Sequence, residues 1–193
     1  MIKAIIFDCF GVLAQDGWLH YSETRFKTPV ERLAASDLLK QHDAGFLTAE
    51  EFATQAAEMS GLPKEELQKI ITTHQSKNDK LLGHIASLKK AGYKLSIVSN
   101  VGEDWLDNFL TKEERGLFDD ILLSYKVKLL KPDPLIYMMA ADRLGILTRE
   151  CVFIDDRQVC VDGAKAVDMQ AIRYQSFDQF IADLSTILTN TDY

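Results

Sequence analysis

Five short apolar runs, separated by much longer segments, constrain this chain more than any other feature of its sequence. Most of the intervening segments carry apolar residues at helical spacing. Short buried strands that alternate with amphipathic helices are typical of a parallel sheet covered by helices. We therefore expect an α/β fold with a parallel sheet. The runs are residues 4–7, 95–98, 121–123, 152–154 and 171–174.

Two of the intervening segments predict helices that pack on this sheet. In residues 79–88 apolar side chains recur every three or four positions, and Gly92 follows as a stop signal. Residues 177–188 place their apolar side chains on one face, so we expect this helix to close the chain against the sheet. That face carries Phe177, Phe180, Ile181, Leu184 and Leu188.

The segment before residue 79 contains helix signals but no strand. Thr48 and Glu51 form a capping box that opens one helix, and Leu62-Pro63 opens a second. We expect a small all-helical cap over the strand ends, inserted into the sheet-containing core. The predicted cap is 14–78, and the predicted core is 1–13 with 79–193.

Composition narrows the class of protein. The chain has 193 residues, 47% of them hydrophobic, which is enough to bury a sizeable core. Its formal net charge of -7 argues against nucleic acid as a partner, because phosphate backbones are bound by clustered Lys and Arg. No apolar run has the length of a membrane span, and the N-terminus lacks the features of a signal peptide. We expect a cytoplasmic protein without a membrane partner.

Polar side chains follow most of the predicted strands. Ligands of open parallel sheets bind at the carboxyl ends of the strands, so these side chains are the candidates for chemistry. Each alone is typical of a turn or a helix cap. Three carboxylates at neighbouring strand ends would repel one another unless a cation neutralised them, and Mg²⁺ prefers such ligands. The candidates are Asp8, Ser99, Asn100, Lys131, Asp155 and Asp156.

Four stretches, in the order FDCFGVL, IVSN, KPDPLIY and FIDDRQVCVDGA, resemble the motifs of the haloacid dehalogenase superfamily. The resemblance covers almost the whole chain and is to the branch with a helical cap after the first motif. It implies a Rossmann-like, three-layer α/β core with a small inserted cap. It also implies an Mg²⁺-dependent phosphatase that acts on a small phosphorylated metabolite.

The resemblance also assigns roles to the candidate residues. Asp8 would attack phosphorus and form an aspartyl intermediate, and Lys131 would neutralise the transferred group and orient Asp8. Ser99 and Asn100 would hold that group. The implied Mg²⁺ ligands are Asp8, the backbone carbonyl of Phe10, Asp156 and, as a secondary ligand, Asp155.

Phe10 is the main departure from the family pattern. Most phosphatases of the family carry a second Asp here, which protonates the leaving oxygen and later activates water. Loss of a positioned acid costs about 10²- to 10⁴-fold in rate, or roughly 3 to 5 kcal/mol. Residues near the motifs that would replace it are Asp16, His20, Glu103 and Asp104.

Two other readings remain open at this point. A 2-haloacid dehalogenase carries an aromatic Tyr at the position of Phe10 and needs no proton for its halide, but it uses no metal and lacks the tandem Asp155-Asp156. The other is a non-catalytic binding protein on this fold. Cys160 in place of the usual Asn, and Lys128 in place of a common Gly, favour it, whereas the retained acids and lysine count against it.

The cap sequence offers few clues to specificity. We expect Trp18 and Tyr21 to pack near the hinge between cap and core. Arg25 is a candidate to pair with a carboxylate or phosphate of the substrate.

Overall fold

Within residues 1–73 and 76–189, which the computed structural model describes, five strands form one parallel sheet in the order β3-β2-β1-β4-β5. Each strand contains most of one of the apolar runs, so the predicted α/β fold class is confirmed. Residues 74–75 of the predicted cap and 190–193 of the predicted core lie outside the described residues. The strands are β1 (Ala4–Phe7), β2 (Lys94–Ser99), β3 (Asp120–Leu123), β4 (Cys151–Asp155) and β5 (Gln170–Arg173).

The strand order places the end of β1 at the centre of the site-forming edge. From β1 the chain adds β2 and β3 on one side, and then crosses back to add β4 and β5 on the other. Phe7, the last residue of β1, pairs with Ile97 of β2 and Ile154 of β4. The residue that follows β1 therefore adjoins the carboxyl ends of both neighbouring strands.

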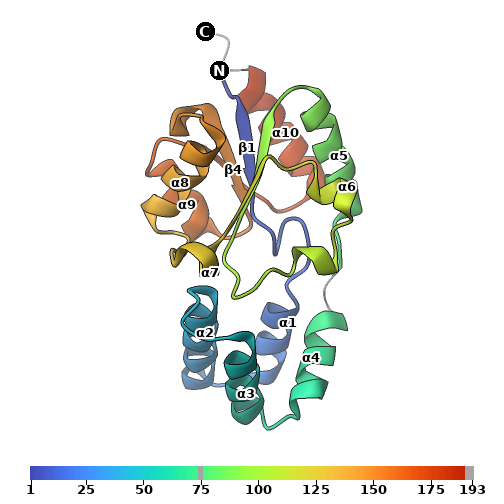
Figure 1. The fold of residues 1–193 in the computed structure, drawn as a ribbon, viewed down its shortest axis with the longest axis vertical. Coiled ribbons are helices and arrows are strands. Elements are labelled where there is room, and N and C mark those ends of the chain that lie inside the picture. The colour runs from blue at the N-terminus through green and yellow to red at the C-terminus, as the bar shows by residue number, and fades with distance from the viewer. Residues whose placement is uncertain (74–75, 190–193) are drawn as a thin grey trace.

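Helices cover both faces of the sheet, as the three-layer prediction requires (Figure 1). Ile5 and Phe7 pack with α5 (Asp79–Lys90) and α10 (Phe177–Thr189). Ala4 and Ile6, which point to the opposite face, pack with the other pair of helices. That pair is α8 (Pro134–Leu144) and α9 (Gln158–Lys165). Both helices predicted to cover the sheet are confirmed.

Shorter elements lie in the connections. They are α6 (Lys112–Arg115), α7 (Ser124–Val127), and 3₁₀ turns at Leu106–Asn108 and Thr148–Glu150. In the described part of the chain, no helix combines the length and the apolar character that would let it cross a membrane.

Four further helices gather beyond the carboxyl ends of the strands (Figure 1). They enclose an apolar cluster of their own, which includes Trp18, Tyr21 and Leu67. The capping box of Thr48 and Glu51 is present at the start of the third helix, as predicted. The four are α1 (Gly17–Arg25), α2 (Pro29–Asp43), α3 (Ala49–Ser60) and α4 (Lys64–Thr73).

We propose that 14–78 forms a cap domain on a core made of 1–13 and 79–193. The two chain crossings between these parts lie side by side. Gln15 N donates to the Ser76 carbonyl (2.9 Å), and Asn78 N donates to the Leu13 carbonyl (2.8 Å). A paired crossing of this kind is suited to act as a hinge.

Asn78 joins this crossing to the core through its side chain. Its Oδ1 caps α5 by accepting from Leu81 N (3.2 Å), while its Nδ2 donates to the Val12 carbonyl (3.0 Å) and to the Tyr174 hydroxyl (2.8 Å). We expect Asn78→Ala to lower the free energy of unfolding by about 1 to 2 kcal/mol, because the helix loses its cap and partly buried groups lose partners.

Urea unfolding measures this loss. Asn108→Ala, at an exposed position in a 3₁₀ turn, is the matched control and should change stability by less than about 0.5 kcal/mol. Equal stabilities for the two variants would contradict the role assigned to Asn78.

Candidate active site

The residues predicted from the strand ends come together at one edge of the sheet. Asp8 follows β1, Ser99 ends β2 and Asp155 ends β4. Lys131 reaches the same place from the loop between α7 and α8. The parallel topology brings them together because all five strands end at the same edge.

Lys131 is the centre of a buried charge cluster. Its Nζ lies 2.7 Å from Asp8 Oδ1 and 2.7 Å from Asp155 Oδ2, and only 4% of the residue is exposed. Burial by itself lowers the pKa of the Lys131 ammonium, but the charges of Asp8 and Asp155 outweigh burial and raise it. The lysine is therefore cationic whenever the site is folded.

Among the described residues, the cluster holds three carboxylates but only one lysine to balance their charge. Asp8, Asp155 and Asp156 each offer one oxygen within 4.8 Å of the others. Burial raises the pKa of Asp8 well above its usual range, and attraction to Lys131 offsets only part of this effect. Burial, followed by repulsion from Asp155, raises the pKa of Asp156. Both shifts arise first from burial, and repulsion among the three carboxylates adds to them beside a single ammonium.

Two buried polar atoms at this edge have no hydrogen-bond partner among the described residues. They are Ser99 Oγ and Asp156 Oδ1. Buried polar atoms in folded proteins are nearly always bonded, so these two atoms indicate a place for ligands. A hydroxyl suits an anion, and a carboxylate oxygen among other carboxylates suits a divalent cation. The site therefore fits Mg²⁺ together with a phosphate group.

Asn100 and Asp155 are already engaged within the protein. Asn100 Oδ1 accepts from Lys131 N (2.8 Å), and its Nδ2 donates to the Lys131 carbonyl (3.1 Å). Asn100 thus fixes the backbone that carries the lysine, and its second amide hydrogen is what it offers a ligand. Asp155 uses one oxygen for Lys131 and the other for Arg157 N (2.9 Å), which leaves it less suited to hold a metal than Asp156.

Gly11 makes room for Asp156. Its φ of 90° lies in the left-handed region, and a Cβ built there would be 2.4 Å from the Asp156 carboxyl carbon. The chain can therefore bend after Asp8 and still leave space for the Asp156 carboxylate, which directly follows β4.

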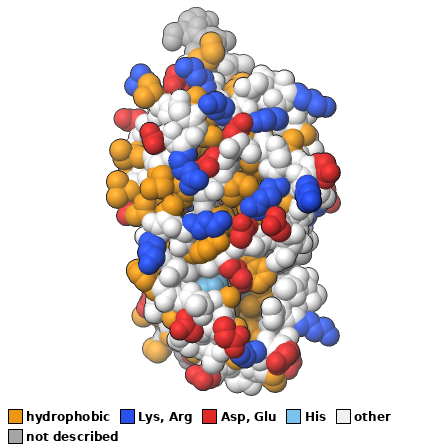
Figure 2. All heavy atoms as spheres, viewed as in Figure 1, with side chains coloured by type: hydrophobic (Ala, Val, Ile, Leu, Met, Phe, Trp, Pro, Cys, Tyr) orange, Lys and Arg blue, Asp and Glu red, His pale blue; other side chains and the backbone are white. Residues whose placement is uncertain are grey.

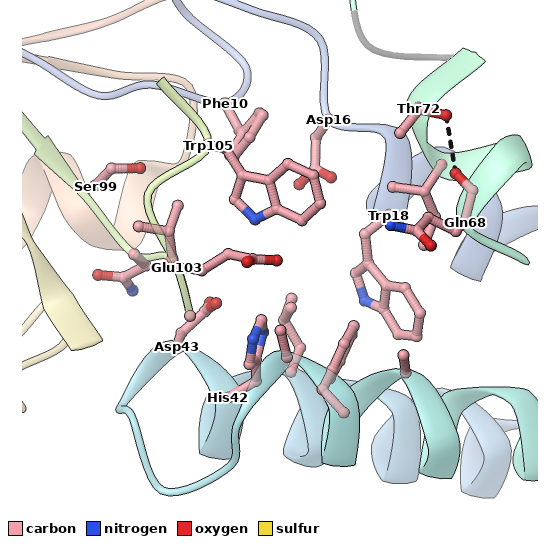
Figure 3. Close-up of a pocket in the computed structure, with 18 of the residues that line it drawn as sticks. Phe10, Asp16, Trp18, His42, Asp43, Gln68, Thr72, Ser99, Glu103 and Trp105 are labelled. Carbon is pink, nitrogen blue, oxygen red and sulfur yellow. Dashed lines mark hydrogen bonds between the residues drawn. The ribbon is translucent and has the colours of Figure 1, made fainter. Parts of the chain in front are cut away.

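A cavity of about 310 Å³ lies between the core edge and the four cap helices. The core contributes Asp8, Ser99 and Lys131 to its wall. Figure 3 shows the cap side chains that face the same space, among them Trp18 and His42. Asp8 can thus be reached from a chamber that the cap helices cover.

Phe10 lies in the cavity wall, in the loop that also carries Asp8 and Asp16. The residue is partly buried, and its ring centroid is 6.3 Å from that of Phe109. The side chain extends an aromatic surface into the cavity where the family pattern has an acid.

The residues considered as substitutes for that acid differ in position. Asp16 and Glu103 line the cavity (Figure 3). His20 is an exposed residue of α1 and does not line it. Asp104 is partly buried, which raises its pKa, but the ion pair with Arg115 (3.0 Å) outweighs burial and holds the pKa below its usual range. Asp104 is therefore an ionised partner of arginine rather than a proton source.

Three other expectations have clear outcomes. The Arg25 guanidinium donates to the Ser60 carbonyl at the end of α3, so it ties two cap helices together instead of facing the cavity. Trp18 and Tyr21, expected near the hinge, pack in the apolar cluster of the cap helices, and Trp18 also lines the cavity. Lys128 is exposed and lies outside the cavity wall, while Cys160 is buried in α9.

Sequence reasoning missed His42 and Asp43, which end α2 and line the cavity (Figure 3). The His42 ring stacks on Phe52 with centroids 4.4 Å apart, and burial lowers its pKa to about 4. A second capping box, Thr28 with Glu31, marks the start of α2 and would have revealed the helix. No local pattern shows that its far end faces the strand ends.

Comparison with known proteins gives a consistent result. A family model described as haloacid dehalogenase-like hydrolase matches residues 2–168. A phosphatase from Mycobacterium tuberculosis is 26% identical over 96% of this chain and 95% of its own. An (S)-2-haloacid dehalogenase from Burkholderia cepacia is 35% identical over 46% of this chain. The sequence matches to two (S)-2-haloacid dehalogenases cover less than half of those proteins' length.

The fold is also shared with a solved structure. A HAD family enzyme from Bacteroides thetaiotaomicron, crystallised in complex with magnesium and inorganic phosphate, superposes with a TM-score of 0.74. The match covers 92% of this chain and 96% of the other, at 21% sequence identity.

The contact between Gly11 and Asp156 can be tested directly. We expect Gly11→Ala to lower the free energy of unfolding by about 1 to 3 kcal/mol, because the new Cβ requires a left-handed backbone and meets the Asp156 carboxyl. Chemical denaturation measures the change. Gly83→Ala, whose Cβ would meet nothing within 4 Å in α5, should instead stabilise by about 0.5 to 1 kcal/mol. The same sign for both variants would contradict the account.

Proposed function

The chain belongs to the haloacid dehalogenase-like hydrolases, and we propose that within this family it is an Mg²⁺-dependent phosphatase of small phosphorylated metabolites. One observation carries the proposal. Asp8, Asp155 and Asp156 gather around a single lysine, with a buried, unbonded Ser99 hydroxyl beside them among the described residues. This arrangement offers ligands to both a cation and a phosphate.

The charge of the cluster supports the metal. Three carboxylates against one ammonium leave two negative charges if all are ionised, and a divalent cation would balance them. Asp8, Asp156 and the Phe10 carbonyl would hold Mg²⁺, with Asp155 in a secondary role. When bound, Mg²⁺ would polarise the phosphate and reduce its repulsion from the attacking carboxylate.

The contacts of Asp8 support its role as nucleophile. Asp8 Oδ1 accepts from Cys9 N (2.6 Å) and contacts Lys131 Nζ (2.7 Å). These contacts orient the carboxyl group and leave Oδ2 to attack phosphorus and form an aspartyl phosphate. The Ser99 hydroxyl and the second amide hydrogen of Asn100 would hold phosphate oxygens, while Lys131 compensates the charge of the transferred group.

The relatives support the same choice. The Mycobacterium phosphatase matches nearly the whole chain, whereas the dehalogenase matches about half. The Bacteroides structure contains magnesium and inorganic phosphate, the two ligands that the charge cluster would accept here. Acidic and basic side chains are interspersed over the visible face, which is consistent with a small substrate rather than a nucleic acid (Figure 2).

A 2-haloacid dehalogenase is the second candidate. The aromatic side chain of Phe10 favours it, because halide leaves without a proton. The third carboxylate of the cluster counts against it, since a metal-free site would hold Asp156 buried and unbonded on one oxygen.

The nucleophile and the metal are tested together. We expect phosphate release from a panel of phosphorylated metabolites, p-nitrophenyl phosphate and acetyl phosphate to require Mg²⁺ and to stop with chelator. Asp8→Asn should lower turnover at least about a thousandfold, because the amide cannot attack phosphorus. Asp37→Asn, an exposed change on α2, is the control.

Two results would count against this function. Undiminished phosphate release by Asp8→Asn would show that the nucleophile lies elsewhere. Halide release from 2-haloacids with chelator present, and without phosphate release from the panel, would favour the dehalogenase.

The missing acid makes a separate prediction. If no other group of the site supplies the proton, Phe10→Asp should raise turnover of alkyl phosphates, up to about 100-fold, and that of aryl and acyl phosphates much less, because only alkoxides need a proton to leave. Phe10→Asn changes size and polarity in the same way without supplying an acid. Equal effects of Phe10→Asp and Phe10→Asn on alkyl phosphates would show that the lack of an acid at position 10 does not limit turnover.

A further inference from the structure

Asp43 is a buried carboxyl group that the proposed mechanism leaves without a role. It is the last residue of α2 and lines the cavity that also contains Asp8 and Phe10. Figure 3 shows it at the end of its helix, on the side of the cavity where Glu103 lies. Its carboxyl oxygens have no hydrogen bond or ion pair with any residue in 1–73 or 76–189. Asp43 is 9% exposed and lines the cavity, so its carboxyl group is available to a ligand bound there.

The end of α2 is fitted onto the core beside the strand ends. The Ser124 hydroxyl donates to the Asp43 carbonyl (2.6 Å), and Ser124 Oγ also accepts from Val101 N (2.9 Å). Val101 follows Asn100 directly in the chain. Ser124 thus links the Asp43 backbone to the loop that carries the predicted phosphate-binding residues.

Two glycines make this fit close. A Cβ on Gly102 would lie 2.2 Å from the His42 ring, and a Cβ on Gly45 would lie 2.7 Å from the Tyr125 carbonyl. The Gly102 backbone therefore lies against the His42 ring, and the Gly45 backbone lies against the Tyr125 backbone, so core and cap meet closely at both ends of the His42–Gly45 turn. The contact of α2 with the core thus brings Asp43 to the cavity wall.

The surroundings of Asp43 suit proton transfer. Burial, followed by repulsion from Asp16 of α1, raises its pKa to about 7, while Arg157 before α9 and Lys131 lower it. His42 on its own helix is neutral, because burial lowers its pKa to about 4. Glu103, on the loop after β2, faces the same cavity and is less buried. A general acid works best when its pKa lies near the working pH.

The other cavity acids fit this task less well. Burial raises the pKa of Asp16 as well, but its carboxylate accepts from Leu19 N (2.9 Å) as the cap of α1, a bond that offsets part of the rise and keeps the group engaged. Burial raises the pKa of Glu103 too, but Glu103 belongs to the core and is more exposed than Asp43. Asp43, by contrast, is buried and belongs to a cap helix.

We propose that Asp43 replaces the acid missing at Phe10 as the proton donor and acceptor of this site; the proposal rests on the phosphatase function, and it predicts that the gain from Phe10→Asp is small in the wild type and large in Asp43→Asn. Asp8 Oδ2 bonds to phosphorus as the ester P–O bond breaks, and the leaving alkoxide takes the Asp43 proton. Water then attacks phosphorus and gives its proton to the Asp43 carboxylate. The bond between phosphorus and Asp8 breaks, which releases phosphate and regenerates both carboxyl groups.

Asp43→Asn separates these two steps with p-nitrophenyl phosphate. Nitrophenolate leaves without a proton, so stopped flow should show a burst of about one equivalent at a rate within about tenfold of the wild type. The following steady state should be slower by about 10²- to 10⁴-fold, because no base activates water. With glycerol phosphate, whose alkoxide needs the acid, both the burst and the turnover should be lost.

The pH profile gives a second readout. In the wild type, kcat/KM for glycerol phosphate should fall as pH rises above about 7, because the protonated acid is required. This limb should be absent from the residual activity of Asp43→Asn and restored in part by Asp43→Glu. Asp37→Asn, exposed on the same helix, should leave burst, turnover and profile unchanged.

The alternatives are distinguishable. Wild-type leaving-group dependence in Asp43→Asn, with Asp8→Asn inactive, would overturn the role of Asp43 and leave the phosphatase function intact. Transfer of the whole pattern to Glu103→Gln would assign the proton to the core loop instead. Absence of Mg²⁺-dependent phosphate release in the wild type would overturn both proposals together. Thermal unfolding of each variant checks that the fold is retained.

Discussion

The ion contacts of Lys131 with Asp8 and Asp155 are the constraint on which the rest of the structure depends. Asp8 follows β1 and Asp155 ends the neighbouring β4, and these contacts join both residues to the loop between α7 and α8. Removal of the lysine would leave uncompensated charges in a buried place, which costs several kcal/mol. The strand order and the clamp of Asn100 on the Lys131 backbone both serve to hold this contact.

The sheet and most of the charge cluster could be predicted because their signals are local. An apolar run such as 152–154 indicates a buried strand by itself, and the topology rule then places the following Asp155 and Asp156 at the ligand-binding edge. What the sequence did not reveal was how these groups divide their contacts. Both oxygens of Asp155 are used by the protein, while one oxygen of Asp156 is left unbonded, and only coordinates separate two adjacent identical residues.

The cap was predicted as helical but its contribution to the site was not. The Ser124 hydroxyl meets the Asp43 carbonyl across 81 positions of sequence, and no periodicity or motif reports a contact of that kind. Arg25 shows the opposite error. Its charge near the first motif suggested a substrate contact, yet its guanidinium serves the end of a neighbouring cap helix. Both contacts join residues far apart in the sequence, and local propensity reports neither; close approaches at Gly45 and Gly102 accompany the first.

A proton source on the cap has a consequence that an acid at position 10 would lack. An acid on the core loop is present whether the cap is open or closed, so water and substrate reach it in either state. Asp43 is next to the core only through the seated end of α2. Proton transfer then requires closure, and closure is also what excludes water from the aspartyl phosphate. Phe10 is compatible with a nucleophile on the core and an acid on the cap, because its apolar side chain near Asp8 cannot transfer a proton.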